Sequence, residues 1–507
     1  MQVNQQFSMK EKQADAFAGL RFANSYARLP ERFYARLDPI PVRNPTLIRI
    51  NHLLADELGL NAEELSSDQG VAMLSGNEVP GGAEPVATAY AGHQFGNFVP
   101  QLGDGRAILL GEIIDRHGKR RDIQFKGSGR TPFSRQGDGR AALGPVIREY
   151  IVSEAMHALG IPTTRSLAAV TTGEPVFRET ALPGAILTRV AASHVRVGTF
   201  EYFAARKDNE AVKHLADYVI DRHYPHVKEA QNPYCALFEA VRDAQVSLVA
   251  SWLHVGFIHG VMNTDNMAIS GETIDYGPCA FLDTYDPATV FSSIDYYGRY
   301  AYGNQGPIAQ WNLIRFGVTL LPLLDADRET AIAMVQAMVE SFSAVFNRAW
   351  LSGMRRKIGL LTDNDADLTL IQDFLGLLQK QTADYTLTFR YLCDAADDDT
   401  DDRRLREVFA TCQEIEAWLA RWRTRISQEK ETPAQRAVAM RQVNPAFIPR
   451  NHRVEQAIEA AVAACDFTKM DTLITVLSRP YDDQPAFQDY MNPPKPEERV
   501  YQTFCGT

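Results

Sequence analysis

Three polar residues in one short segment have the types and spacing of a metal and nucleotide site. The segment is HGVMNTDNMAISGETIDYG, residues 259–277, in which Asn266 and Asp275 offer the oxygen ligands that Mg²⁺ prefers. Mg²⁺ usually takes one or two ligands from a protein and the remainder from phosphates and water. Asp265 adds a carboxylate next to Asn266. The segment therefore predicts a Mg²⁺ site with Asn266 and Asp275 as ligands and Asp265 as a candidate proton acceptor.

The same segment follows the spacing of a kinase catalytic loop with one substitution. Kinases place a histidine, a catalytic aspartate, an asparagine five residues after that aspartate, and a second aspartate in a DFG-like turn. Here His259, Asn266 and Asp275 keep their places, whereas Val261 stands in the place of the first aspartate. Valine cannot accept a proton, which argues against ordinary γ-phosphoryl transfer. The alternative is that NTDN forms a plain Asx-rich turn, which is common in loops.

A lysine and a glutamate upstream match the phosphate-positioning pair that such a loop needs. Residues 106–126 are predicted to form a hairpin with Lys126 at the end of its second strand. Pro145 then opens a predicted helix that carries both Glu149 and Glu154. These glutamates lie roughly 140° apart around a helix, so only one can face Lys126. Glu149, nearer the helix start, is the predicted partner, and unrelated surface charges are the alternative.

Two glycine-rich loops and two later arginines are candidate phosphate ligands. Backbone N–H groups freed by glycine form anion-binding nests, and arginine adds paired donors. One loop precedes the hairpin, the other follows Lys126, and the arginines lie in a predicted strand and in the turn after it. The candidates are Gly103, Gly105, Arg106, Asp138, Gly139, Arg189 and Arg196. Ordinary flexible loops and surface arginines are the alternative.

The elements that must position these residues are mostly helical in pattern. Residues 200–425 are predicted to be helical apart from a short β-rich segment at 259–283. The run DAADDDTDDRR at residues 394–404 is predicted to be a solvated loop. The sequence as a whole predicts an α+β, kinase-like, two-lobed fold. Its expected parts are an N-terminal extension with a mixed β/α lobe at 1–190, a mainly helical lobe at 191–430 and a C-terminal helical extension at 431–507.

Composition limits the partners of this chain. The 507 residues carry a formal net charge of −11, so we expect no nucleic acid, whose binding usually requires a basic surface. No apolar run reaches the length that a bilayer requires, and the first residues lack a signal-peptide core, so we expect no membrane and a cytoplasmic location. The six cysteines are scattered without zinc-site spacing. We expect a monomer.

Seven strings in the chain resemble selenoprotein O proteins. They are YAGHQFGNFVPQLGDGRAILLGE, QFKGSGRTPFSRQGDGRA, REYIVSEAMHALGIPTTR, LTRVAASHVRVGTFE, HGVMNTDNM, DYGP and NPAFIPRNHRVEQAI. The resemblance runs from about residue 20 to the C-terminus. It implies a protein-kinase-like fold that binds ATP in a flipped orientation and transfers AMP, with Mg²⁺ or alternatively Mn²⁺, to Ser, Thr or Tyr hydroxyls of protein substrates, the chain itself included.

The resemblance also implies roles for single residues. Lys126 and Glu149 correspond to the ion pair, Asp265 to the proton acceptor, and Asn266 and Asp275 to the metal ligands. The implied nucleotide-binding positions are Gly103, Gly105, Arg106, Lys126, Asp138, Gly139, Arg189, Arg196 and Asp275. If the γ-phosphate lies against the lysine and the two late arginines, attack occurs at the α-phosphorus and the leaving pyrophosphate is stabilised.

A redox switch and two other activities are further hypotheses. Cys505 stands where animal members of the resembled family carry selenocysteine, and Phe291 stands where some bacterial members have a second cysteine. Cys279 is the nearest alternative partner for a disulfide with Cys505. A metal-dependent kinase that transfers the γ-phosphate, and an inactive pseudokinase that serves as a scaffold, are the competing functions.

Overall fold

The computed structural model describes residues 21–397 and 402–504. Its N-terminal part is built on one antiparallel β-sheet. The sheet has eight strands in the order β1-β3-β6-β7-β10-β9-β2, and β8 also pairs with β10. Two small sheets, β4-β5 and β11-β12, lie outside it. The strands are β1 Tyr34–Arg36, β2 Thr46–Ile50, β3 Val86–Thr88, β4 Gly92–Gln94, β5 Asn97–Val99, β6 Ala107–Ile114, β7 Arg120–Lys126, β8 Ala141–Ala142, β9 Arg165–Phe177, β10 Ala181–Ala191, β11 Phe257–Ile258 and β12 Ala280–Phe281.

The predicted hairpin is the centre of this sheet. β6 and β7 pair antiparallel with Ala107 opposite Lys126, and β10 pairs antiparallel with β7 on its other side. Ile123 and Phe125 of β7 are buried, as the alternation of apolar and polar residues requires. The register of β10 places Arg189 opposite Gln124 and Leu187 opposite Lys126. Two residues predicted to bind phosphate therefore come from neighbouring strands.

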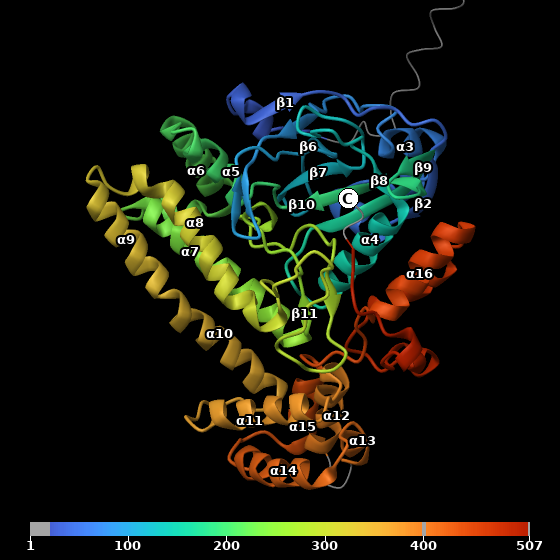
Figure 1. Cartoon of the computed structure of the whole chain (residues 1–507), viewed down its shortest axis with the longest axis vertical. Coiled ribbons are helices and arrows are strands. Elements are labelled where there is room, and N and C mark those ends of the chain that lie inside the picture. The colour runs from blue at the N-terminus through green and yellow to red at the C-terminus, as the bar shows by residue number, and fades with distance from the viewer. Residues whose placement is uncertain (1–20, 398–401, 505–507) are drawn as a thin grey trace, which may run out of the picture.

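Helices pack on both faces of this sheet, α1–α3 on one face and α4 on the other, and further helices form the rest of the molecule (Figure 1). Helix α4 begins two residues before the predicted start at Pro145, whose missing N–H falls in the first turn, where it is not needed. The helices are α1 His52–Leu58, α2 Ala62–Leu65, α3 Asp68–Leu74, α4 Leu143–Ala158, α5 Val197–Ala205, α6 Asn209–His223, α7 Pro233–Val255, α8 Gln305–Leu324, α9 Arg328–Glu340, α10 Phe342–Lys357, α11 Asp367–Lys380, α12 Tyr385–Asp397, α13 Arg403–Glu407, α14 Cys412–Ile426, α15 Pro433–Arg441, α16 Asn451–Ala464 and α17 Thr468–Leu477.

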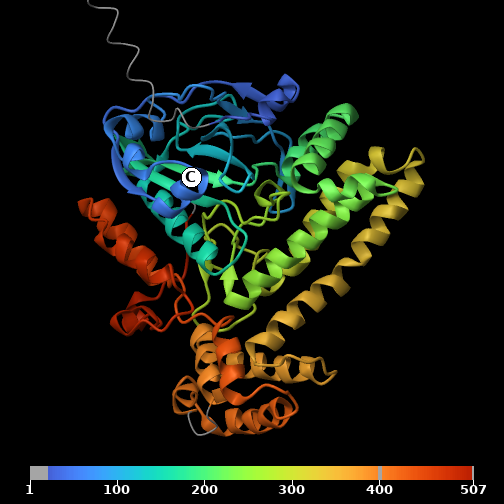
Figure 2. The same ribbon diagram turned by 180° about the vertical axis from the view of Figure 1, so that it is seen from behind.

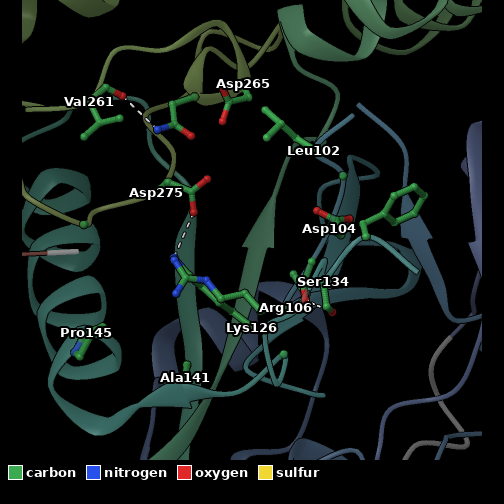
Figure 3. Close-up of a pocket in the computed structure, with 18 of the residues that line it drawn as sticks. Leu102, Asp104, Arg106, Lys126, Ser134, Ala141, Pro145, Val261, Asp265 and Asp275 are labelled. Carbon is green, nitrogen blue, oxygen red and sulfur yellow. Dashed lines mark hydrogen bonds and ion pairs between the residues drawn. The ribbon is translucent and has the colours of Figure 1, made fainter. Parts of the chain in front are cut away.

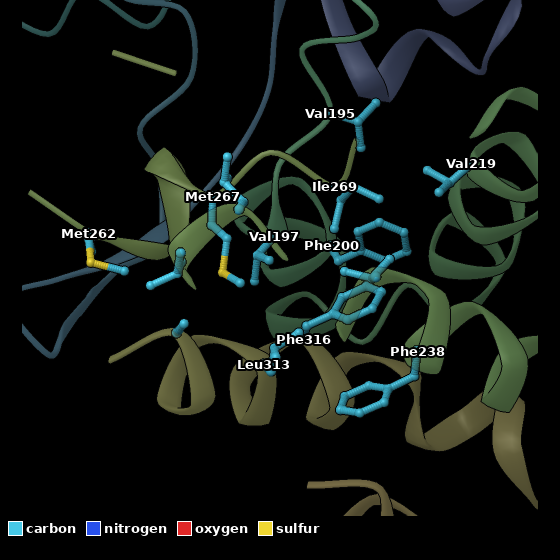
Figure 4. Packing of buried hydrophobic residues seen from close by; sticks show 14 of the residues in the cluster. Val195, Val197, Phe200, Val219, Phe238, Met262, Met267, Ile269, Leu313 and Phe316 are labelled. Carbon is cyan, nitrogen blue, oxygen red and sulfur yellow. The ribbon is translucent and has the colours of Figure 1, made fainter. Parts of the chain in front are cut away.

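The largest hydrophobic core joins the sheet region to the helical part. Figure 4 shows Phe200 of α5, Phe238 of α7 and Phe316 of α8 packed against Val197 and Ile269. Phe238 and Phe316 stack with ring centroids 6.0 Å apart, and Phe200 meets Phe316 edge-on at 5.1 Å. This core lies directly behind the loop that carries Asp265, so that loop rests on a rigid base.

The segment predicted to be β-rich, residues 259–283, is mostly loop, so that prediction was wrong. The one strand within these residues is β12, which pairs with β11 just before the segment, and a 3₁₀ turn covers Thr264–Asn266. The polar side chains explain the difference, because Asn, Thr and Asp bond to nearby backbone and neighbouring loops instead of joining a ladder. Thr163 and Thr164 at the start of β9 anchor the far end of the loop by a bridge to Thr273.

Helices α11–α15 form a second helical layer at the end farthest from the sheet (Figure 1). Its core contains Trp418 and Trp422 of α14, which stack 5.9 Å apart. Lys357, the last residue of α10, is buried beside this core and donates to Asn444 Oδ1 at 2.8 Å. Burial lowers the pKa of Lys357 to about 7.

The acidic run is not the solvated loop that its composition predicts, in the part that the structure describes. Asp394 lies within α12 and pairs with Arg441 at 2.9 Å, and Asp402 is buried and pairs with Arg423 at 2.8 Å. Arginines on neighbouring helices therefore hold two of these carboxylates in place. Residues 398–401 lie outside the described residues.

Helices α16 and α17 return from the far end and pack against α4 (Figures 1 and 2). Ile147 and Ile151 of α4 share a hydrophobic cluster with Val454 of α16 and Met470 of α17. α4 is thus enclosed between the sheet and the C-terminal helices. Among residues 21–397 and 402–504, no helix combines the length and hydropathy that crossing a bilayer requires.

Candidate active site

A cavity of about 630 Å³ lies between the sheet, α4 and the 259–278 loop, and it gathers the predicted site residues. Figure 3 shows Asp275 between Asp265 on one side and Lys126 on the other. The predicted residues that line the cavity are Gly103, Gly105, Arg106, Lys126, Asp138, Gly139, Glu149, Arg189, Arg196, Asp265, Asn266 and Asp275. Residues separated by more than a hundred positions in the sequence therefore share one pocket.

Lys126 and Glu149 form the predicted ion pair. Lys126 Nζ lies 2.6 Å from Glu149 Oε2, and Arg189 holds the other oxygen of the same carboxylate at 2.5 Å. Glu154, the alternative partner, points to the other side of α4, where it binds Arg165 at 2.7 Å. The ion pair is therefore made by Glu149, the glutamate nearer the helix start, and not by Glu154.

Asp275 is the common acceptor of three cations. Lys126 and Arg189 reach its Oδ1 at 3.0 and 2.7 Å, and Arg196 reaches its Oδ2 at 2.9 Å. Burial alone would raise the pKa of Asp275, but the three cations, Arg189 foremost, hold it well below its usual range. Its φ of 64° is in the left-handed region, a conformation that non-glycine residues rarely adopt outside functional sites.

Three cations and their carboxylate partners converge at the buried end of the cavity. Glu149 and Asp275 both keep lowered pKa values despite burial, Glu149 because Arg189 and Lys126 lie beside it. Arg189 is 2% exposed, and its guanidinium lies at the buried end of the cavity. Lys126, Arg189 and Arg196 thus bring three positive charges together in a largely enclosed space. Such a site attracts a polyanion.

Asp265 lies on the side of Asp275 opposite to Lys126, and within the part of the chain that the structure describes its carboxylate forms no ion pair with the cations of the cavity (Figure 3). Its side chain is buried, and burial raises its pKa to about 6. Arg196 donates to its backbone carbonyl at 2.8 Å, not to its carboxylate. Oδ1 of Asp265 is buried without a hydrogen bond among the described residues, so one carboxylate oxygen is not committed to the protein.

His259 and Val261, two residues of the kinase-like loop, hold the loop backbone and Asn266 in place. His259 Nδ1 accepts from Val261 N at 3.3 Å, so its Nε2 donates to Ile274 O at 2.9 Å and ties the loop to the turn before Asp275. The carbonyl of Val261 accepts from Asn266 Nδ2 at 3.0 Å. That bond leaves Asn266 Oδ1 as the free end of the amide. Val261 therefore orients Asn266 but supplies no base.

The two glycine-rich loops pack on each other at the open side of the cavity. A Cβ on Gly103 would lie 2.3 Å from the ring of Phe133, and one on Gly139 would lie 2.1 Å from Gly129 O, so neither position accepts a side chain. Thr131 Oγ1 donates to Asp104 O at 2.7 Å and joins the loops. Asp138 at the edge pairs with Arg178 at 2.9 Å. Its role in binding nucleotide stays a prediction.

Two residues that line the cavity, Asp104 and Tyr90, were not predicted from the sequence. Asp104 lies between the two glycines and is buried, with Oδ2 accepting from Thr88 Oγ1 at 2.6 Å. Its Oδ1 lies 3.9 Å from Arg196 Nη2. Tyr90 places its ring 4.6 Å from the guanidinium carbon of Arg196. Both lie in the string YAGHQFGNFVPQLGDGRAILLGE, and the aspartate of its GDGR motif could have indicated a further polar residue in the site.

The last described residues close over the turn that follows Asp275. Thr503 is fully buried, its Oγ1 donates to Pro278 O at 2.6 Å, and its N–H donates to Phe291 O at 2.7 Å. Ser292 and Thr503 form a parallel bridge. Cys505 lies outside the described residues, so the predicted disulfide stays a hypothesis.

The donor set is consistent with one hard divalent cation. Asn266 Oδ1 and the Asp275 carboxylate line the same cavity, and among residues 21–397 and 402–504 no cluster of three His, Cys, Asp or Glu ligands exists. Two oxygen ligands with room for phosphates and water suit Mg²⁺ and do not suit a closed zinc site.

Comparisons with known proteins agree over nearly the whole chain. A family model described as protein adenylyltransferase SelO matches residues 16–478. A Rhizobium etli protein named protein nucleotidyltransferase YdiU is 63% identical over 498 residues, which cover 98% of this chain and 99% of the relative. Relatives of the same name from Rhizobium meliloti and a Bradyrhizobium species are 62% and 60% identical, each over 96% of this chain and 99% of its own length.

Proposed function

The chain belongs to the SelO family of protein adenylyltransferases, and we propose that its cavity binds ATP and transfers AMP to hydroxyl side chains of protein substrates. The observation that carries the residue roles is the separation of charge within the cavity. Lys126, Arg189 and Arg196 converge at the enclosed side, whereas the uncommitted carboxylate oxygen of Asp265 lies on the other side of Asp275. A triphosphate held at its β and γ end by the cations presents its α-phosphorus toward Asp265.

The reaction then runs at the α-phosphorus. The hydroxyl oxygen of a Ser, Thr or Tyr side chain attacks that phosphorus, and the bond to the oxygen that bridges to the β-phosphate breaks. Pyrophosphate leaves, and the two arginines and Lys126 stabilise its charge. The hydroxyl proton passes to Asp265. A carboxyl group with a pKa of about 6 is ionised at neutral pH and is a stronger base than an exposed aspartate.

Asn266 and Asp275 would hold the divalent metal. A bound Mg²⁺ or Mn²⁺ would offset charge on the phosphate oxygens near the reacting phosphorus. The bond from Asn266 Nδ2 to Val261 O keeps the amide oxygen turned away from the backbone and available as a ligand. Glu149 has a different task, because it fixes Lys126 and Arg189 in place through both of its oxygens.

Labelled nucleotide distinguishes this proposal from the two competing functions. Incubation with ATP labelled at the α-phosphate should label protein, and intact-mass measurement should find a gain of one AMP. Label that comes only from the γ-phosphate would show a kinase. No label from either position, with ATP still bound, would show a scaffold.

A further inference from the structure

A small hairpin outside the main sheet lies directly on the loop that carries Asp265. Strands β4 and β5 pair with Gln94 opposite Asn97, so Phe95 and Gly96 are the two loop residues. Both have positive φ, 51° and 86°. That combination is the type I′ turn, which matches the twist of paired strands but strains a residue with a side chain.

Contacts with the catalytic loop compensate for the strain at Phe95. Its N–H donates to Asn263 Oδ1 and to Tyr300 Oη, both at 3.1 Å. His93 N donates to Thr264 Oγ1 at 2.7 Å. The hairpin is therefore bonded to the two residues that immediately precede Asp265. A strained conformation held in this way is typical of a position under functional constraint.

Alternation along β4 turns two of its residues toward Asp265 and one away from it. Gly92 and Gln94 share a face of the strand, and His93 faces the other way, with its Nδ1 2.5 Å from Glu201 Oε1. Gln94 Nε2 donates to Asp265 Oδ2 at 3.3 Å. A Cβ on Gly92 would lie 2.5 Å from Asp265 Oδ1 and 3.0 Å from its Cβ and Cγ. Gln94 therefore contacts one oxygen of the Asp265 carboxylate, and Gly92 packs against the other.

We propose that the hairpin Gly92–Val99 holds the proton acceptor in position, with Gln94 as the positioning residue and Gly92 as the position that leaves room for the carboxylate. This inference rests on the proposed role of Asp265. The amide of Gln94 donates to Oδ2 and the backbone of Gly92 packs against Oδ1, so these two contacts together set the orientation of the carboxylate. Gln94 also lines the cavity, so it stands at the side from which a substrate hydroxyl reaches Asp265.

The first test removes the donor and keeps the shape. Gln94→Met retains the length of the side chain but cannot donate to Oδ2. Because one hydrogen bond to a charged group is lost, we expect kcat for AMP transfer to fall about tenfold. The KM for ATP and the unfolding temperature should stay unchanged. A purely structural role would instead lower the unfolding temperature, and a role in nucleotide binding would raise the KM for ATP.

The second test displaces the carboxylate. Gly92→Ala places a methyl carbon 2.5 Å from Asp265 Oδ1, too close for both to stay in place, and the backbone of Gly92 does not require glycine, since its φ is not in the left-handed region. We expect a larger fall in kcat, on the order of 100-fold, with ATP binding retained. Asn97→Ala is the matched control, because Asn97 is an exposed residue of the same hairpin, and it should keep kcat within about twofold of the wild-type value.

A double-mutant cycle shows whether Gln94 acts through Asp265. In an Asp265→Asn background, Gln94→Met should cause no further loss of AMP transfer, measured by intact mass over long incubation. An equal fall in both backgrounds, or wild-type kcat for Gln94→Met, would overturn the inference and leave the role of Asp265 standing. Wild-type activity of Asp265→Asn alone would instead overturn the proposed base, and with it this inference.

Discussion

If ATP binds as proposed, Asp275 competes with its phosphates for the same three cations. It accepts from Lys126, Arg189 and Arg196 at distances between 2.7 and 3.0 Å, so the triphosphate must displace it from all of them. Asp275→Asn keeps the shape of the side chain and removes its charge. The variant should therefore bind ATP more tightly than the wild type when no metal is present, although it loses a metal ligand.

The size of the effect follows from the bonds that Asp275 gives up. Each hydrogen bond to a charged group is worth about 1.5–3 kcal/mol. The neutral oxygen of asparagine can still accept hydrogen bonds from the cations, so only part of this stabilisation is lost in Asp275→Asn. A net relief of about 1.4 kcal/mol corresponds to a tenfold tighter Kd for ATP without metal. The same variant should lose at least about 100-fold of its metal-dependent AMP transfer.

Calorimetric titration with ATP in the presence of a chelator measures the first quantity, and labelling from α-labelled ATP with Mg²⁺ measures the second. Asp482→Asn is the control, because Asp482 is an exposed carboxylate far from the cavity. The reasoning is refuted if Asp275→Asn binds metal-free ATP no better than the wild type. Tripolyphosphate should also raise the unfolding temperature of Asp275→Asn more than that of the wild type, since the variant leaves three buried cations with less compensation.

Three further predictions concern Val261, a buried lysine and the C-terminal contact. Val261→Ala should keep AMP transfer within about threefold in the labelling assay, because only its backbone holds Asn266, and a loss as large as that of Asp265→Asn would contradict this. Lys357 has a pKa lowered from 10.5 to about 7, so the unfolded chain binds more protons between these values and stability rises with pH across that window. Denaturant midpoints at pH 7 and 9 should therefore rise for the wild type and stay level for Lys357→Met, and equal slopes would refute the burial argument. Thr503→Val removes the donor to Pro278 O and should speed hydrogen exchange in the Asp275–Pro278 turn at least about fivefold, whereas unchanged exchange would show that this contact is not stabilising.

Local periodicity predicted the ion pair because both of its residues lie in regular elements. β7 ends at Lys126, and the turn of α4 separates Glu149 from Glu154, so spacing shows that only one glutamate can face the lysine, and Glu149 is the predicted partner because it lies nearer the helix start. The sequence predicts Arg189 in a strand and Arg196 in the turn before the next helix, and the structure has Arg189 in β10 and Arg196 immediately before α5. The assembly of all predicted site residues in one cavity followed from the resemblance more than from periodicity.

Features that depend on long-range partners could not be predicted in this way. The charge of the acidic run predicts a solvated loop, but Asp402 is buried because Arg423 of α14 approaches it from another helix, in addition to Arg406 four residues further on in α13. The 259–283 segment contains β-prone residues, yet its polar side chains are bonded to distant loops, as Thr264 is to His93 N. Composition reports the residues of a segment but not the partners that the fold brings to them.

The contact of Thr503 with Pro278 also makes the turn after Asp275 dependent on a remote part of the chain. Thr503 lies 225 residues after Pro278, yet its hydroxyl fastens this turn. A chain shortened before residue 503 lacks the bond, so the turn loses one of its restraints even though every residue that lines the cavity is present.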